Sequence, residues 1–453
     1  MCPLPERLEI IYEEILSLLS EQRFSEIKER LSSLEPADIS EILCEVPAAK
    51  RALLFRLLPK DLAIEVFEHM EGSEREDLLN SFTDKETAEI VEEMSDDDRT
   101  ALFDELPAKT VKKLLRHLSP EERKIANSLL NYKPFSAGRI MTPEFIDLKA
   151  SMTAQEAIQH IRKEARRKET IYTCFVTDNE RRLLGVVELE DLILANPETP
   201  VSMLMEDDPV YVTTDTDQEE CAQIMSKYDL HALPVVDRER RLVGIVTFDD
   251  VLDVIEEEAT EDFEKMAGIQ PVEDTYLNTG ILALSKKRFL WLLICILTEA
   301  ITSSVLKNYS VALERVVALS FFIPLLIGTG GNAGTQSSTL VIRGMTLGEI
   351  EWKNIGYIFG REILTGLLLG GALSILAVGR AYMLGTGSGV AITVALALIA
   401  VVTIGNLAGA LLPFAARLFR IDPAIMSGPF ITTIVDVLGL IVYFEIARHV
   451  LHV

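Results

Sequence analysis

The chain has 453 residues and a formal net charge of −26, from 70 acidic and 44 basic residues. The part from residue 281 onward holds 8 acidic and 12 basic residues, so the first 280 residues carry the other 62 and 32, a balance of about −30. Such a surface repels nucleic acid and attracts cations. No Ser-His-Asp, HExxH, Walker or CxxC pattern occurs, so the sequence also argues against an enzyme.

Residues 1–134 contain an internal repeat. The strings LEPADISEIL, LPKDLAIEVF, FTDKETAEIV and LPAKTVKKLL begin at Leu34, Leu58, Phe82 and Leu106, a period of 24 residues, and a second set is offset by 12. Each string predicts a short amphipathic helix, with Pro, Ser or Asp near its start. Two helices per repeat predict a small α-helical solenoid over 1–134, and the acidic run at 96–98 is typical of a solvated helix face.

Residues 138–198 and 201–260 form a second duplication with a different period. LLGVVELEDLI at Leu183 matches LVGIVTFDDVL at Leu242, and each copy predicts a β-α-β-β-α order. This duplication resembles a tandem pair of CBS domains, a module that implies sensing of adenosyl ligands or ions. Thr247 and Asp250 stand in the turn that can hold ribose and phosphate. Glu188 replaces the threonine in the first copy, which argues against nucleotide binding.

The stretch 255–280 is compatible with a helix and acidic at its start. It predicts either a plain linker or a helix that couples the acidic N-terminal part to the apolar C-terminal part.

Five apolar runs occupy the C-terminal part, at about 289–306, 316–342, 355–378, 390–414 and 424–447, each long enough to cross a bilayer. They predict an all-α membrane domain at 285–453. Basic residues gather before the first run and in the second and fourth connections, so the positive-inside rule predicts cytoplasmic N-terminal domains and a C-terminus outside.

The second run contains PLLIGTGGNAGTQ at 324–336. Lipid cannot satisfy free backbone groups, so a helix broken by glycines at membrane depth would face protein or a water-filled path. The pore residues predicted here are Gly328, Gly330, Gly331, Asn332 and Gln336. The alternative is close helix packing through small residues.

Asp436 in the last run is the strongest candidate for a functional acid inside the membrane. Thr432 lies one helical turn before it, and a carboxylate with hydroxyl and carbonyl oxygens suits a hard cation such as Mg²⁺. The alternative is a buried ion pair with Arg343 or Arg361. Three other acids are placed nearer the ends of their spans, where they would pair or snorkel: Glu299, Glu362 and Glu445.

Together, PLLIGTGGNAGTQ, RIDPAIMSGPFITTIVD, the CBS-like pair and the preceding helical repeat resemble the MgtE family of bacterial magnesium channels over nearly the whole chain. The resemblance implies a homodimer in the membrane, with a central pore lined by the second and fifth spans. It places partly hydrated Mg²⁺ at Asp436 and the Thr432 carbonyl.

The resemblance also implies a cytosolic Mg²⁺ sensor, in which acidic residues repel one another until bridging ions close the pore. Matched by motif, the regulatory residues are Glu65, Asp97, Glu219, Asp229, Asp250, Asp253, Glu258, Glu261, Asp262 and Asp422. Ala101 stands where the family often has a second acid after Asp97. Glu190 stands where nucleotide-binding members carry a basic residue, so ATP is not expected to be a strong ligand.

Two other functions fit parts of the sequence. A membrane-bound CBS sensor of nucleotide or ion would need no pore, and a broader divalent-cation transporter would share the same site. A coupled secondary transporter fits less well because the five spans show no pair of matching half-repeats.

Overall fold

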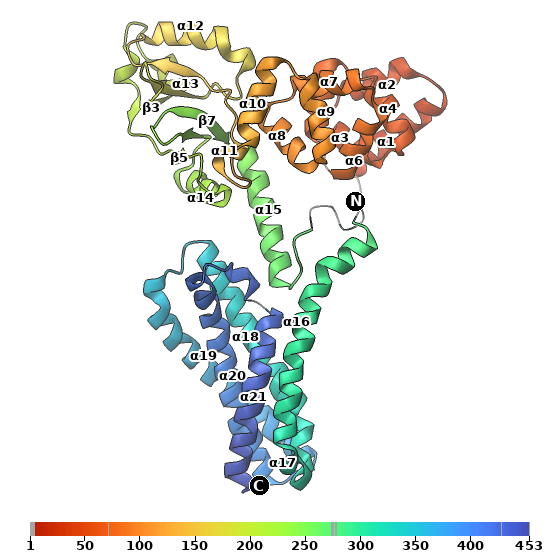
Figure 1. Cartoon of the computed structure of the whole chain (residues 1–453), viewed down its shortest axis with the longest axis vertical. Helices are drawn as coiled ribbons and strands as arrows, with labels where there is room; N and C mark the ends of the chain where they lie inside the picture. The colour runs from red at the N-terminus through yellow and green to blue at the C-terminus, as the bar shows by residue number, and fades with distance from the viewer. Residues whose placement is uncertain (1–4, 71, 273–275, 277–278, 427, 453) are drawn as a thin grey trace. The chain divides into compact units, whose positions relative to one another are not determined.

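The computed structural model describes residues 5–70, 72–272, 276, 279–426 and 428–452. The chain divides into two compact units, Met1–Glu258 and Ala259–Val453. Figure 1 shows the helices and strands of both units.

The first unit begins with ten helices that confirm the predicted repeat. Helices α3 to α10 each begin two residues after the start of a repeat string, where Pro, Ser, Thr or Glu precedes the first turn. Thr83, for example, forms a capping box with Glu86 at the start of α7. The bounds are α1 Glu6–Ser20, α2 Phe24–Leu31, α3 Pro36–Glu45, α4 Ala48–Phe55, α5 Lys60–Glu68, α6 Gly72–Ser81, α7 Asp84–Glu93, α8 Asp96–Glu105, α9 Ala108–His117 and α10 Pro120–Leu130.

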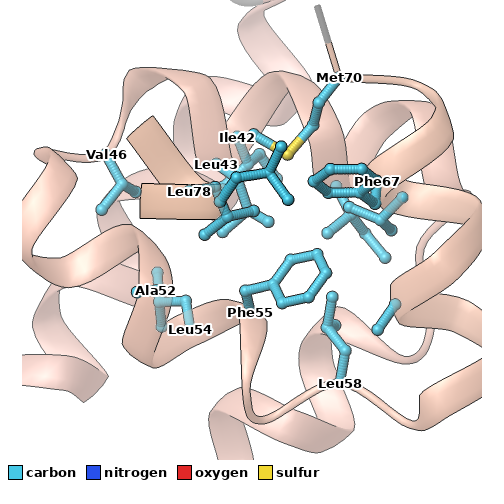
Figure 2. Close-up of a cluster of buried hydrophobic side chains, with 14 of the residues drawn as sticks. Ile42, Leu43, Val46, Ala52, Leu54, Phe55, Leu58, Phe67, Met70 and Leu78 are labelled. Atoms are coloured by element: carbon cyan, nitrogen blue, oxygen red, sulfur yellow. The ribbon is translucent and has the colours of Figure 1, made fainter. Parts of the chain in front are cut away.

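These helices share one apolar core, because each buries the same face of its repeat. Figure 2 shows Phe55 of α4 pointing into the core that also receives Phe67, Leu58 and Met70 from the next repeat. The rings of Phe55 and Phe67 meet edge to face, with centroids 6.3 Å apart. Stacked repeats therefore stabilise each other, as a solenoid requires.

The duplicated α/β segment forms two small sheets, which confirms the β-α-β-β-α order. In the first copy β2 pairs in parallel with β1 and antiparallel with β3, and β6 pairs in the same way with β5 and β7 in the second copy. The bounds are α11 Ala137–Ile140, β1 Asp147–Lys149, α12 Ala154–Glu164, η1 Ala165–Arg167, β2 Thr173–Thr177, β3 Leu183–Glu188, α13 Leu189–Leu194, η2 Val201–Met203, β4 Glu206–Asp207, β5 Val212–Thr213, α14 Gln218–Tyr228, β6 Ala232–Val236 and β7 Leu242–Thr247.

The connecting helix predicted at 255–280 begins and ends earlier in the structure. Helix α15 runs from Phe248 to Met266, so it starts inside the second CBS-like copy and stops well before residue 280. Gly268 follows with a positive φ of 72°, and Pro271 cannot continue a helix, so the chain turns there. Residues 273–275 and 277–278 of the predicted segment lie outside the described residues.

Within its described residues, the second unit contains five helices long and apolar enough to cross a membrane, in agreement with the five predicted runs. They are α16 Ile281–Asn308, α18 Ile323–Thr346, α19 Ile355–Met383, α20 Ser388–Leu418 and α21 Gly428–Leu451. Shorter elements join them: α17 Ser310–Arg315, η3 Val317–Phe322, η4 Trp352–Asn354 and η5 Pro423–Ile425.

The glycine motif does not break its helix, contrary to the prediction from the sequence. Helix α18 continues through all of it, and neighbouring α20 approaches so closely at Gly330 and Gly334 that only glycine fits at these two positions. A Cβ atom added at Gly405 would lie 2.4 Å from the Gly330 carbonyl oxygen, and one at Gly409 would lie 2.0 Å from that of Gly334. These glycines therefore serve close helix packing.

Candidate functional site

Asp436 lies on α21 and is 5% exposed, although its span is strongly apolar. Its Oδ1 is buried without a hydrogen-bond partner, and Asp436 forms no ion pair among the described residues, so the alternative of a buried pair with Arg343 or Arg361 is not found. A buried, unpaired carboxylate is expensive unless a cation or water meets it. This geometry favours a cation site at Asp436.

Thr432 lies one turn before Asp436 and packs against the glycine motif of α18. Its hydroxyl donates to the Gly428 carbonyl at 2.8 Å, while its methyl carbon would lie 2.9 Å from a Cβ added at Gly331. The absence of a side chain at Gly331 thus lets α21 approach α18.

The other predicted pore residues divide between two faces of α18. Gly330 and Gly331 are buried against α20 and α21, whereas Gly328, Asn332 and Gln336 are exposed on a second face. Their spacing of four residues places these three on one stripe. The structure therefore separates packing residues from an uncovered polar stripe.

The three other membrane acids differ from each other. Glu445 pairs with Arg448 at 3.1 Å and accepts a hydrogen bond from Tyr309 at 2.7 Å, and Glu362 accepts one from Ser337 at 2.9 Å. Glu299 behaves otherwise than predicted: it lies well inside α16, is exposed, and has no hydrogen bond or ion pair within the described part of the chain.

The first unit brings together Asp97 of α8 and Asp250 of α15, which are 153 positions apart. The negative charge of Asp97 raises the pKa of Asp250, and the Thr247 hydroxyl donates a hydrogen bond to the Asp250 carboxylate. Asp97 is only 7% exposed and Asp96 3%, so the expected solvated face at 96–98 is wrong. Asp96 is neutralised by Arg99, which also binds Glu122 at 2.6 Å.

Five further carboxylates interact electrostatically with Asp97, with Asp250 or with one another, and the sequence did not predict them: Glu68, Asp98, Glu144, Glu169 and Asp249. We refer to these five with Asp97 and Asp250 as the acidic cluster. Within the described residues none of the seven forms an ion pair. They come from both the helical repeats and the α/β segment, so no spacing in the sequence could reveal them.

Burial is the main reason that these carboxyl groups are hard to ionise. It raises the pKa of Glu68 to about 7, although the Ser95 N–H donates to that carboxylate at 3.0 Å and partly offsets the effect. Burial, then the neighbouring Asp97, raises the pKa of Asp250 well above its usual value, and burial with Asp98 raises that of Asp97. These buried carboxyl groups are therefore harder to ionise than exposed ones, although Lys168 and Arg99 act in the opposite direction on Glu144.

Several other predicted regulatory residues lie apart from this cluster's centre. Glu65 is exposed on α5, where its negative charge raises the pKa of Glu68. Asp253 is exposed on α15. Glu258 accepts a hydrogen bond from Gln218 of α14 at 2.9 Å. On the same helix α14, Glu219 lies in the first turn and Asp229 ends the helix in a left-handed conformation.

In the second unit, Glu261 and Asp422 meet at a lysine. The Lys265 ammonium lies 2.6 Å from Glu261 and 2.7 Å from Asp422, which joins the end of α15 to the last connection between spans. Burial lowers the pKa of Lys265, but the two hydrogen bonds outweigh it and the pKa is raised. Asp262 lies beside this contact in sequence and is half-buried. We refer to Glu261, Lys265 and Asp422 as the lysine bridge.

In the first CBS-like copy, the Glu188 carboxylate is hydrogen-bonded within the domain. Glu188 accepts hydrogen bonds from the Thr173 hydroxyl at 3.0 and 3.1 Å. A carboxylate at this position repels phosphate.

Among the residues that the structure describes, no three His, Cys, Asp or Glu side chains converge closely enough to enclose a metal ion. Mg²⁺ keeps several of its waters and is commonly held by one or two carboxylates, so a hydrated ion needs no such cage.

Known proteins resemble this chain along nearly its whole length. The magnesium transporter MgtE of Thermus thermophilus is 40% identical over 425 residues, which cover 93% of this chain and 94% of the relative. The chain belongs to the MgtE family. The MgtE protein of Bacillus subtilis, also named a magnesium transporter, is 33% identical over 97% of both chains.

Family profiles agree with this assignment segment by segment. The MgtE profile, described as a divalent cation transporter, matches 323–446, and the MgtE intracellular N domain matches 34–134. CBS domains match 137–198 and 201–257. The chain is thus a multi-pass membrane protein with the layout predicted from its sequence.

Two solved structures resemble a little more than half of this chain. The cytosolic domain of the Mg²⁺ channel MgtE in complex with ATP is 39% identical, with a TM-score of 0.51 over 54% of this chain and 99% of that one. The soluble part of a magnesium transporter is 31% identical, with a TM-score of 0.53 over 56% and 99%.

Proposed function

We propose that this protein carries Mg²⁺ across the cytoplasmic membrane and that Asp436 binds the ion in transit. The observation that carries the proposal is the buried Asp436 Oδ1, which has no partner among the described residues. The names of the MgtE relatives support Mg²⁺ as the cargo. A single carboxylate with carbonyl oxygens suits an ion that keeps part of its hydration.

The pore is formed by two copies of the chain. The exposed stripe of Gly328, Asn332 and Gln336 supports this, because amide side chains facing lipid are costly and need a partner subunit or water. In a homodimer the two stripes would face each other across a central path beside Asp436. The first unit is cytosolic, and the C-terminus lies outside.

Cytosolic Mg²⁺ closes this pore by binding to the acidic cluster. Carboxylates that repel one another across the helical repeats and the CBS domains favour separation at low Mg²⁺, and bridging ions reverse that preference. The closing effect equals the difference in ion affinity between the two arrangements. Glu219, Asp229, Asp253, Glu258, Glu261 and Asp262 contribute further weak sites.

Mg²⁺ flux into liposomes that contain the full chain tests both parts. Asp436→Asn should abolish flux at every Mg²⁺ concentration, whereas Asp250→Asn should conduct normally and need more cytosolic-side Mg²⁺ to close. Glu314→Gln, an exposed acid on α17, is the matched control and should behave as wild type. Flux that survives Asp436→Asn would refute the pore assignment, and loss of all flux in Asp250→Asn would refute the sensor.

ATP is a secondary question for the CBS pair. The solved ATP complex of a relative supports a nucleotide site, and the internal use of Glu188 opposes it. We propose that the CBS pair binds ATP only weakly, at Thr247 and Asp250, and titration of the full chain with ATP measures this. The same flux assay with Ca²⁺, Mn²⁺ and Co²⁺ tests how far the family description as divalent cation transporters applies.

A further inference from the structure

Helices α16 and α21, the first and last membrane helices, contact each other within the second unit (Figure 1). At one end the Tyr309 hydroxyl donates to Glu445, and the Tyr309 ring stacks on Phe444 with centroids 4.8 Å apart. Because Tyr309 directly follows α16 and Glu445 lies near the end of α21, this contact fixes the register of the two helices.

Counting back from that contact places three oxygen-bearing side chains at one depth. Asp436 lies nine residues before Glu445, and Glu299 and Thr302 lie ten and seven before Tyr309. At about 1.5 Å per residue these offsets are roughly 14, 15 and 10 Å. Asp436 is therefore bracketed in depth by Glu299 and Thr302.

Two of these three side chains have a buried oxygen without a partner. Asp436 Oδ1 and Thr302 Oγ1 are both buried and have no hydrogen-bond partner among the described residues, and the two side chains are 5% and 6% exposed. Thr302 is unusual in this respect, since the hydroxyl of Thr298 on the same helix donates to the carbonyl of Ile294 at 2.9 Å. Thr302 follows Glu299 by one helical turn and shares its side of α16.

Charge is unbalanced at this depth. Glu299 and Asp436 are both acidic and lie well inside their helices, whereas the basic residues of α16 and α21 lie near the helix ends: Lys286, Lys287, Arg288, Lys307 and Arg448. Like charges in a low-dielectric medium repel strongly. Two carboxylates require two positive charges, which one divalent cation supplies.

We propose that Glu299 and Thr302 of α16 form, with Asp436, a dicarboxylate site for a hydrated divalent cation, so that the first membrane helix takes part in ion binding. This inference rests on the proposed function, because it assigns partners to the ion at Asp436. The second carboxylate raises the preference for divalent over monovalent cations, and the Thr302 hydroxyl accepts from a water of the ion.

The alternative occupant is a basic side chain of a partner subunit, which would turn Glu299 into an interface ion pair. The two cases differ in what they control. An ion-site carboxylate sets the Mg²⁺ concentration at half-maximal flux and the exclusion of Na⁺. An interface carboxylate sets the stability of the dimer.

The experiment measures Mg²⁺ uptake and Na⁺ leak in liposomes for the full chain, with variants checked for intact assembly by size-exclusion chromatography. Glu299→Gln should raise the half-saturating Mg²⁺ concentration about tenfold and increase Na⁺ leak, and Thr302→Val should raise it roughly threefold. Glu299→Asp should restore the exclusion of Na⁺. Ser304→Ala is the matched control, since that hydroxyl is already bonded to the Ala300 carbonyl at 2.9 Å.

The outcomes separate the two proposals. Unchanged half-saturation and Na⁺ leak in Glu299→Gln, with wild-type flux intact, would overturn this inference alone. Dimer dissociation without a change in either flux parameter would overturn it in favour of the interface. Absence of Mg²⁺ flux in the wild type would overturn the proposed function, and this inference with it. If Glu299→Gln fails to assemble, Glu299→Asp and Thr302→Val still decide the question.

Discussion

The acidic cluster of the first unit and the lysine bridge of the second unit both gather carboxylates, but they meet opposite electrostatic conditions. Asp97 and Asp250 face each other without an ion pair in the described part of the chain. Glu261 and Asp422 instead share the Lys265 ammonium at 2.6 and 2.7 Å. The same residue types therefore leave charge unsatisfied in one place and satisfy it in the other.

This difference shows that acidic residues alone do not define a cation sensor. A site responds to Mg²⁺ only where the protein itself supplies too little positive charge. By that criterion the acidic cluster is the stronger candidate for the regulatory site. The lysine bridge already contains its own counter-charge, so we expect Mg²⁺ to bind more weakly at Glu261 and Asp422 than at the acidic cluster.

Removal of the Lys265 charge gives the largest expected effect. Lys265→Met leaves the Glu261 and Asp422 carboxylates without their shared counter-ion. Because these side chains are half-buried, we expect the free energy of unfolding to fall by about 2 kcal/mol. The stability of this variant should then depend on Mg²⁺. Thermal unfolding of the full chain with and without Mg²⁺ measures it.

Two controls accompany that variant. Lys265→Arg should keep the wild-type stability, and Lys353→Met, which removes an exposed pair with Glu351, should change it little. If Lys265→Met is as stable as the wild type and its stability does not depend on Mg²⁺, the Lys265 charge does not stabilise the fold at the lysine bridge.

The reverse exchange places a fixed cation in the acidic cluster. Asp249 is exposed, so Asp249→Lys has room for its side chain and should reduce the Mg²⁺ needed to close the pore by about tenfold. Half-closure in the liposome flux assay measures this, with Glu198→Lys as a control of equal charge change outside the cluster. An equal shift in both variants would mean that net charge, not the cluster, sets the response.

Protonation of the acidic cluster should stabilise the folded protein as Mg²⁺ binding does, but by a smaller amount. The folded pKa of Glu68 is raised to about 7, so the folded protein binds more protons than the unfolded chain between the ordinary carboxyl range and pH 7. Stability without divalent cations should therefore rise as the pH falls from about 8 to about 6, by roughly 1 kcal/mol per such carboxyl. Glu68→Gln should flatten this dependence in thermal unfolding, and a slope of the opposite sign would contradict the assignment.

Monovalent salt gives the smallest expected effect. Screening over about 8 Å at physiological ionic strength weakens the repulsion within the acidic cluster, so NaCl should stabilise the Mg²⁺-free chain by under about 1 kcal/mol. The same salt should weaken the lysine bridge slightly. A salt titration of the wild type and of Asp249→Lys separates the effect at the acidic cluster from the effect at the lysine bridge. The variant should show little of the NaCl stabilisation, because its lysine already reduces the repulsion within the cluster.

The sequence predicted what is periodic or apolar. The 24-residue repeat placed the starts of helices α3 to α10, and hydropathy placed the five membrane helices, because both patterns follow from local burial. The course of α18 through its glycines was predicted wrongly. That outcome depends on how closely α20 approaches, which no local pattern encodes.

The site was predicted only where one residue stands out locally. Asp436 is conspicuous as an acid in an apolar run, and its burial followed. Glu169 and Lys265 gain their importance from partners distant in the chain, Asp97 and Asp422, so the sequence offered no sign of either contact. The assignment of Glu299 to a span end was wrong because position 299 falls near the middle of the apolar run 289–306 and well inside α16.

The glycine contacts between α18 and α20 have a mechanical consequence. Backbone lies directly against backbone at Gly330 and Gly405, and again at Gly334 and Gly409, with no side chain in between to change its rotamer and absorb a displacement. We expect the two helices to move as one stiff plate. Strain that reaches α18 would then pass undiminished to α20, and the compliant joint of the membrane unit would be elsewhere, along the sparsely covered α16.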